Sequence, residues 1–402
     1  MEQHRFRKWS VRSTAERYQY TDHSIKPYEL AMDVNNAIIE SSARHISGRC
    51  LLNGTEVPFV SFSVESNSFR GASTFDLVLA TSSLPATMQM LNWWAAQTTI
   101  RVELSASIIT KSGANEKRLI TGNIDNWHYD PARFEITADG RDFTALLIDA
   151  KSAGESFKNY TSSQIATMLA QRHGLTPVVT TTTQRFGEFY QIDSAHLTGE
   201  QTEWDLITTL AGIENYSVYV DGDSLHFEPV TQPGDADNYV IRWQPPGSLA
   251  YPQCNASDDL SFSRALTISK GVTVEVLSWN AKRKNKQFVA SYPKNAKGTT
   301  PGNATAKTQV YRVIRNGLTP ESATALAQTI YRQVVQHEMK FSGSTAGDNL
   351  LTPQTLVRIE GTQSPFDQLY YCDSVRRTLS WDNGYTMSIS GKNHSPALEV
   401  SE

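Results

Sequence analysis

The chain of 402 residues has few cysteines and no long apolar run. Its three cysteines, Cys50, Cys254 and Cys372, lie far apart and are odd in number. A disulfide framework is therefore not expected, and a reducing compartment is the simpler interpretation. No run of about 18 apolar residues occurs, so we expect no membrane insertion. The amino-terminal stretch MEQHRFRKWS is charged but no apolar segment follows it, so we expect no secretory signal.

The sequence also lacks an excess of charge of either sign. Its formal net charge is −4 at pH 7, with 19% charged and 39% hydrophobic residues. These values are typical of a soluble folded protein, whereas a dedicated nucleic-acid-binding protein usually has a clear basic excess. The length is enough for about two to four domains.

Sequence motifs that carry catalytic chemistry are missing. There is no C-x-x-C pair, and His337-Glu338 lacks the second histidine of a zinc-binding helix. Neither glycine-rich phosphate-binding pattern occurs. The run Gly343–Gly347 has threonine where a nucleophile elbow needs serine and no helical pattern after it, so we predict a mobile loop there. We predict no catalytic residues, no metal and no cofactor.

Two pairs of acids are the remaining candidates for hydrolytic chemistry. Glu203 with Asp205 stands in the first turn of a predicted helix, where acids interact favourably with the helix dipole. Asp258 with Asp259 lies in a polar stretch. Two acids alone do not define a catalytic pair, so structural roles are favoured. His226, on the outer face of a predicted hairpin, and the basic run Lys282–Lys286 are both predicted to be solvated.

The hydrophobic pattern divides the chain into four parts. Residues 1–46 are polar and aperiodic and are predicted to form an arm, either a partly disordered tail or a segment laid over a neighbouring subunit. Residues 47–150 contain many short alternating strands, which is typical of a sandwich or closed barrel. Residues 151–230 contain two capped helices and short strands, which indicates a small α/β domain. Residues 231–402 return to strands, with a long loop over 281–308 and a helix over 319–335.

The most distinctive stretch is Gln201–Val230, QTEWDLITTLAGIENYSVYVDGDSLHFEPV. Thr202 and Asp205 have the spacing of a capping box at the start of a helix. Asp221-Gly222 is a signal for a tight hairpin turn between two alternating strands. Pro229 ends the second strand.

This capped helix and V-Y-V-D-G-D-x-L-H-F-x-P hairpin resemble the middle domain of phage baseplate hub proteins. That family includes the late control D proteins of contractile tails and the hub part of type VI secretion VgrG proteins. Gly140-Arg141-Asp142 followed by Leu147-Ile148-Asp149 is similar to the end of the family's first barrel, and Gly384-Tyr385 to the end of the second. The resemblance implies a mainly β fold in which two tail-tube-like β-barrels flank a small α/β domain.

The resemblance also implies a structural function for the chain. It predicts a homotrimer whose ring has six-fold pseudo-symmetry and joins a hexameric tail tube protein to a trimeric spike protein. Baseplate wedge proteins and a tape-measure protein would be further partners, and DNA would be passing cargo only. The expected location is the virion tail baseplate, assembled in the host bacterial cytoplasm. The alternatives are a hub of a type VI secretion or related injection machine, and a tail-associated peptidoglycan hydrolase using Glu203 or Asp205.

Trp93-Trp94 is the candidate protein interface. Adjacent residues of a strand point to opposite faces, so in an extended segment one of these rings would lie outside its own core. Exposed aromatic side chains often mark partner surfaces. A loop that tucks both rings under is the alternative.

Overall fold

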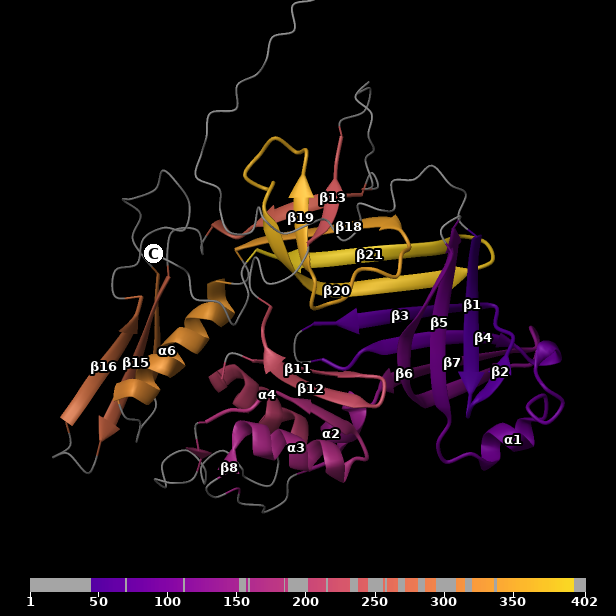
Figure 1. Ribbon diagram of the computed structural model, residues 1–402, viewed down its shortest axis with the longest axis horizontal. Helices are drawn as coiled ribbons and strands as arrows, with labels where there is room; N and C mark the ends of the chain where they lie inside the picture. The colour runs from indigo at the N-terminus through magenta and orange to yellow at the C-terminus, as the bar shows by residue number, and fades with distance from the viewer. Residues whose placement is uncertain are drawn as a thin grey trace, which may run out of the picture.

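Figure 1 shows a computed structural model of the chain, in which two β-rich halves share one continuous sheet. Most of the arm predicted over residues 1–46 lies outside the described residues. The structure describes residues 45–393 except for gaps at 69–70, 111–112, 152–156, 158–159, 184, 187–201, 215, 232–237, 245–255, 257–258, 267–271, 281–285, 294–308, 315–319 and 336–337.

The first half has its own apolar core. Alternation along the strands builds this core, as in the strand where Phe75, Leu77 and Leu79 are all buried. The predicted Asn53-Gly54 turn is present, and both residues have positive φ. A short helix, α1 (Leu91–Ala96), closes one end. The strands are β1 (His45–Leu52), β2 (Thr55–Val57), β3 (Ser61–Asn67), β4 (Thr74–Ala80), β5 (Arg101–Thr110), β6 (Gly113–Asp130) and β7 (Glu135–Asp142).

The α/β unit follows, with helices packed on one face of a three-stranded sheet. Both predicted capping boxes form: Gln164 N donates to Thr161 Oγ1, and Asp205 N donates to Thr202 Oγ1. Gly222 has the positive φ of 58° that its hairpin turn needs. The elements are α2 (Thr144–Asp149), β8 (Tyr160–Thr161), α3 (Ser162–Arg172), β9 (Thr176–Val179), β10 (Arg185–Phe186), α4 (Glu203–Glu214), β11 (Tyr216–Asp221) and β12 (Ser224–Pro229).

The β11–β12 turn also fastens this unit to the first half. Arg101 donates to both carboxylate oxygens of Asp223, over 3.0 and 2.9 Å. Arg118 lies 3.6 Å from Asp221. The turn requires glycine here because of its positive φ, and a Cβ at this position would also force the flexible Arg118 guanidinium, 2.1 Å away, to move. The sequence predicts the turn but not what it contacts.

The second half has a separate core, to which Phe341, Tyr370, Val375, Met387 and Ile389 contribute. Figure 1 shows its strands lying above those of the first half. They are β13 (Tyr239–Arg242), β14 (Ser261–Arg264), β18 (Met339–Ala346), β19 (Leu356–Glu360), β20 (Leu369–Ser380) and β21 (Gly384–Lys392).

A small unit is inserted between β14 and β18. It consists of β15 (Val272–Asn280), β16 (Lys286–Tyr292), β17 (Gln309–Ile314) and α6 (Pro320–Val335), which occupies the range predicted as a helix. The loop predicted over 281–308 is wrong for Lys286–Tyr292, which pairs along β15. The few apolar residues of this short strand do not predict a strand by themselves, because it is stabilised by pairing with β15 and by packing against α6.

The two halves have the same strand order and differ in the direction of one strand. Their sheet orders are β1-β5-β6-β7-β4-β3 and β13-β19-β20-β21-β18-β14, and the strands correspond one to one in chain order. All neighbouring pairs in both orders are antiparallel except β13–β19, which is parallel where β1–β5 is antiparallel. The second half is therefore a structural repeat of the first.

Close packing of one glycine beneath one phenylalanine recurs in both halves. Gly140 on β7 is paired with Phe75 on β4, and Gly391 on β21 is opposite Phe341 on β18. A Cβ on Gly140 would lie 2.6 Å from the Phe75 ring and 2.1 Å from a backbone oxygen of β6. A Cβ on Gly391 would lie 2.3 Å from the Phe341 ring and 2.9 Å from a backbone oxygen of β20. Only glycine fits either site without a shift.

A bulge with an acid–base pair recurs beside each of these glycines. The β6–β7 register shifts between Ile124 and Asn126, and the β20–β21 register shifts between Cys372 and Ser374. The residue at each shift is an aspartate. Arg141 Nε donates to Asp125 over 2.6 Å, and Lys392 Nζ donates to Asp373 over 2.7 Å. The repeat thus extends to individual side chains, although the two segments share few residues.

The halves are joined edge to edge. Strand β3 of the first half pairs antiparallel with β20 of the second, from Ser61 opposite Ser380 to Asn67 opposite Ser374. Asn349 adds a second tie by donating to the carbonyl oxygens of Ala106 and Asn115. The mainly β architecture with a small α/β unit is confirmed. No pairing among the described strands closes either half into a barrel.

Asp142, the last residue of the Gly-Arg-Asp motif, gives the first half a pH-dependent stability. It is buried and accepts hydrogen bonds from the backbone N–H groups of Ser73 and Thr144. Burial outweighs these bonds and raises the pKa of Asp142 to about 6. The folded state therefore holds the proton more tightly than the unfolded chain, and stability from this group falls as pH rises from about 4 to above 6, by roughly 3 kcal/mol.

We expect the free energy of unfolding of the native chain to fall between pH 4.5 and 7.5 more steeply than that of Asp142→Asn, which does not titrate. Urea unfolding of both proteins across this range measures the difference. Curves that stay parallel would contradict the assignment. The variant should be less stable at pH 4.5. Its side-chain amide has a single acceptor oxygen, whereas the backbone N–H groups of Ser73 and Thr144 each need an acceptor.

Candidate functional surface

One face of the shared sheet is a polar surface that extends over eight strands. Along the run β14-β18-β21-β20-β3-β4-β7-β6, one set of alternate side chains enters the cores and the other faces away. Figure 1 shows this run descending from β18 through β21, β20 and β3 to β4, β7 and β6. We call the outward set the polar face. Its hydroxyl-bearing members are Ser61, Ser63, Thr74, Thr137, Ser261, Ser263, Ser342, Ser344, Ser374, Thr378, Ser380, Thr386, Ser388 and Ser390.

Charges on the polar face are largely compensated by neighbours. Arg376 contacts Asp76 at 3.1 Å and Glu65 at 3.6 Å, and so ties β20 to β3 and β4. Arg141 lies between Asp125 and Asp149, and these hydrogen bonds raise its pKa further above the usual range. Paired guanidinium groups offer little free positive potential to a phosphate backbone.

The hydroxyls of this face bond chiefly to one another or to acids. The Oγ atoms of Ser374 and Ser390 lie 2.9 Å apart, as do those of Ser261 and Ser342. Ser344 donates to Asp259 through both its backbone N–H and its Oγ, and these bonds lower the pKa of Asp259. Lys340 lies opposite Ser263 and His128 opposite Thr137, but among the described residues neither basic side chain is hydrogen-bonded to the hydroxyl, as activation of a nucleophile would need. The chemistry available is that of hydroxyl groups and paired charges.

The run Gly343–Gly347 belongs to the polar face and not to a mobile loop. Its first four residues continue β18 and pair with β21, from Gly343 opposite Ile389 to Ala346 opposite Thr386. The prediction of a mobile loop is therefore wrong. Small residues allow close packing here, since a Cβ on Gly343 would lie 3.1 Å from Leu260.

Glu203 and Asp205, the candidate hydrolytic pair, have separate structural partners. Glu203 is only 2% exposed and binds Arg172 and His173, with His173 Nε2 at 2.6 Å from its Oε2. It thereby joins the end of α3 to the start of α4. Asp205 accepts from both the backbone N–H and the hydroxyl of Thr202. Asp258 lies outside the described residues.

His226 is only partly solvated, in contrast to the prediction. Its ring stacks on that of Tyr219 at 4.6 Å, with 6° between the ring planes. Tyr219 in turn donates to Glu228 over 2.6 Å. Desolvation and the neighbouring carboxylate raise the pKa of Tyr219 well above its usual range. The outer face of the hairpin is covered by its own aromatic pair, which the alternation pattern did not reveal.

Trp93 and Trp94 lie on α1 and not on a strand, so they do not point to opposite faces. Trp94 is 1% exposed, and its indole N–H donates to Met88 O over 2.8 Å. Trp93 packs edge-on against it at 5.2 Å and is half-buried. Trp94 is thus part of the core, and an interface role stays a prediction for Trp93 alone.

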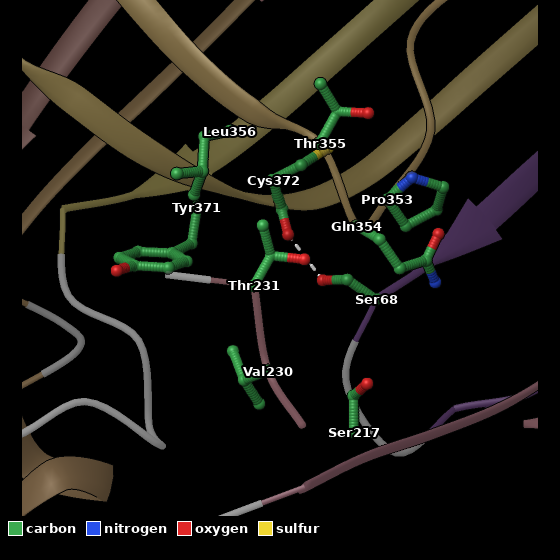
Figure 2. A pocket seen from close by; sticks show the side chains of 10 residues that line it. All are labelled: Ser68, Ser217, Val230, Thr231, Pro353, Gln354, Thr355, Leu356, Tyr371 and Cys372. Atoms are coloured by element: carbon green, nitrogen blue, oxygen red, sulfur yellow. Dashed lines mark hydrogen bonds between the residues drawn. The ribbon is translucent and has the colours of Figure 1, made fainter. Parts of the chain in front are cut away.

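A small cavity lies where β3, the β11–β12 hairpin and the second half meet. Figure 2 shows the Ser68 hydroxyl donating to the carbonyl oxygen of Cys372 beside it. The cavity holds ≈ 30 Å³, room for about two water molecules and too little for a substrate. Burial raises the pKa of the Cys372 thiol to about 12, so it is not a reactive nucleophile.

Among the described residues, no group of three or more histidine, cysteine, aspartate or glutamate side chains could hold a metal ion. No helix in the described part of the chain is long and apolar enough to cross a membrane. The polar face was not predicted from the sequence. Serine at alternate positions, as in Ser342 with Ser344 and Ser388 with Ser390, was the available signal.

No protein-family model matches the sequence, and no curated protein matches it. Solved structures do match the fold. A tail protein from Neisseria meningitidis MC58 is 14% identical, covers 88% of this chain and 98% of its own, and has a TM-score of 0.64. The 43 kDa tail protein of prophage MuSo2 from Shewanella oneidensis is 16% identical over 88% of this chain and 99% of its own, with a TM-score of 0.60.

A chain of the Francisella PdpA–VgrG complex is more distant. It is 9% identical, covers 90% of this chain and 59% of its own, and has a TM-score of 0.51. At these identities the likeness is one of fold. The resemblance to baseplate hub proteins is confirmed at that level.

Proposed function

We propose that this chain is the structural hub of a contractile phage or prophage tail. Three copies would form a pseudo-hexameric ring that joins the hexameric tail tube to the trimeric spike. The repeated strand order of the two halves is the observation that carries this proposal. Three chains with two similar halves present six similar units, which can match a six-fold partner on one side while the whole keeps three-fold symmetry.

The polar face supports the same function. A ring that passes DNA needs a wall that neither strips water from phosphates nor binds them tightly. Short hydroxyl side chains and paired charges provide this, as in the pair between Arg376 and Asp76. We infer that the polar face lines the channel, with DNA as passing cargo. The role is one of symmetry matching and passage, without catalysis.

The proposed partners follow from this position. They are the tail tube protein on one side of the ring, the spike protein on the other, baseplate wedge proteins around it, and a tape-measure protein within the tube. The location would be the virion tail baseplate, with assembly in the host bacterial cytoplasm. The tail proteins from Neisseria and Shewanella support the tail location by fold.

Mass measurement tests the trimer. We expect light scattering on the purified full chain to give three times 44.8 kDa at high concentration, with dissociation on dilution. A strict monomer at the highest soluble concentration would contradict the proposed ring.

An injection-machine hub is the second candidate, favoured by the fold likeness to a chain of the Francisella PdpA–VgrG complex. Genes for tube, tape-measure and tail fibre beside this reading frame would favour a phage tail, whereas secretion-system genes would favour the alternative. A peptidoglycan hydrolase is disfavoured, because Glu203 is buried and its carboxylate is paired with Arg172 and His173. We expect a zymogram to show no clearing.

A further inference from the structure

Strand β20 pairs with two different strands along one edge. Its other edge is paired with β21 from Tyr371 to Ser380. On the edge away from β21, Leu369–Tyr371 pairs with β19, and Ser374–Ser380 pairs with β3 of the first half. The second stretch is therefore the place where one half accepts the edge strand of the other.

Strand β6, the counterpart of β20, has the same two stretches, but only one is paired. On one edge β7 pairs with Gly122–Asp130. On the other, β5 pairs with Gly113–Asn123, and the last contact is the N–H of Ile124 donating to Ile100 O. No described strand pairs with Asn126–Asp130 on that edge. Within the described part of the chain, the backbone groups that correspond to the β3-binding stretch of β20 therefore have no strand partner.

Strand β14, the counterpart of β3, lacks the corresponding partner. β3 lies between β4 and β20, whereas β14 pairs with β18 on one side. On its other side no described strand pairs with Ser261, Phe262 or Ser263. Among the described strands, the eight-strand run β14-β18-β21-β20-β3-β4-β7-β6 therefore has an unpaired strand edge on β14 at one end and an unpaired acceptor edge on β6 at the other.

We infer that β14 of one copy pairs antiparallel with Asn126–Asp130 of β6 in the next copy, and so repeats between chains the β3–β20 contact made within each chain. The inference rests on the proposed ring and specifies its subunit contact. Each copy has one donor strand and one acceptor edge, so the contact is head to tail, and such contacts form a closed ring when the rotation between neighbouring copies closes, as the proposed trimer requires. Exposed strand edges favour such additions, because backbone N–H and C=O groups gain partners.

The repeat also fixes the register. Val64 is opposite Phe75 and Phe262 is opposite Phe341, and because these two phenylalanines are counterparts, Phe262 takes the place of Val64. On the acceptor strand, Arg377 pairs with Met387, which lies four residues before Gly391. Tyr129 pairs with Ile136, which lies four residues before Gly140, so Tyr129 is the counterpart of Arg377.

Within the chain, Val64 is opposite Arg377 and Glu65 is opposite Arg376. Between chains, Phe262 would then be opposite Tyr129, Ser263 opposite His128 and Ser261 opposite Asp130. In this register no two like charges are opposite each other, and the aromatic Phe262 is opposite the aromatic Tyr129.

Disulfide trapping in the full-length chain tests this register. Directly opposed residues on antiparallel strands have Cα atoms ~5 Å apart, which suits a disulfide. We expect the double variant Ser263→Cys/His128→Cys to form covalent dimers and trimers on a non-reducing gel after mild oxidation. Glu65→Cys/Arg376→Cys is the matched positive control, because it places the same two counterparts opposite each other within one chain.

The negative controls are Ser263→Cys alone, His128→Cys alone, and Ser263→Cys/Asn126→Cys, which lies two residues out of register and beyond about 7 Å. We expect the in-register pair to link at least about tenfold faster than each of these. Both His128 and Ser263 are exposed, so the substitutions leave the cores intact.

The outcomes separate the subunit contact from the ring itself. A native trimer whose in-register pair does not link, while the Glu65/Arg376 control does, would overturn the β14–β6 contact and leave the hub proposal standing. Linking by His128→Cys alone would show a symmetric contact and overturn the head-to-tail arrangement. A native chain that stays monomeric would overturn the proposed ring, and with it the subunit contact. Linked trimers at the expected rate would support both.

Discussion

Replacing Gly140 with alanine should destabilise the chain by about 3 kcal/mol or more, the upper range for overpacking a closed site. The added methyl would lie 2.1 Å from a backbone oxygen of β6, and a strand backbone in the middle of a sheet cannot move aside as a flexible side chain can. Phe75 would have to move as well, from 2.6 Å. Urea unfolding followed by tryptophan fluorescence would measure the loss.

The repeated half provides matched controls for this variant. Gly391→Ala meets the Phe341 ring at 2.3 Å but the backbone oxygen only at 2.9 Å, so we expect a smaller loss. Gly343→Ala meets Leu260 at 3.1 Å and should be milder still. If Gly140→Ala proved no worse than Gly343→Ala, the glycine and phenylalanine packing would not be what limits this position.

Removing the carboxylate of Glu203 should have the second large effect, a loss of about 2–3 kcal/mol. Glu203→Ala leaves Arg172 and His173 without the acid that holds them, and it removes the charge that suits the start of α4. Breaking a fully buried pair costs more, but Arg172 is 39% exposed and water solvates part of its charge. Chemical unfolding of the purified variant measures the loss.

Asp205→Ala is the control within the same helix turn. It removes only the bonds from Thr202, so we expect a loss of about 1 kcal/mol, as for other helix caps. A hydrolase would behave differently, because replacing its catalytic acid abolishes activity while leaving stability unchanged or raised. Equal stabilities for Glu203→Ala and the native chain would argue against the structural role given to Glu203.

Other strand edges are alternative sites for a subunit contact, and they include β2 and the two outer strands of the inserted unit, β16 and β17. The edge strand β2 has three residues and offers a short ladder. The helix side of the inserted unit is covered by α6, whose Ala323 and Ala327 pack on β15. The stretch Asn126–Asp130 is longer than β2 and has an occupied counterpart in the same chain, which makes it the best-supported acceptor edge.

The sequence alone determined the local structure of this protein. Alternation identified strands such as β4, and the spacing of Thr161 with Gln164 identified the start of α3, because these patterns depend only on neighbours along the chain. The Asn53-Gly54 and Asp221-Gly222 turns followed from the positive φ that glycine tolerates. The resemblance supplied the expectation of two related β-rich parts.

Only the tertiary structure decided which strands are neighbours. Every strand has the same backbone donors and acceptors, so the sequences of β3 and β20 do not predict that these two strands pair. The hydrogen bond from Arg376 to the hydroxyl of Ser63 likewise joins residues 313 positions apart. Strand β16 and the run Gly343–Gly347 were misread for the same reason, since their few apolar and small residues gain meaning only beside β15 and β21. Periodicity is a property of a segment, whereas pairing depends on how separate segments bury their faces together.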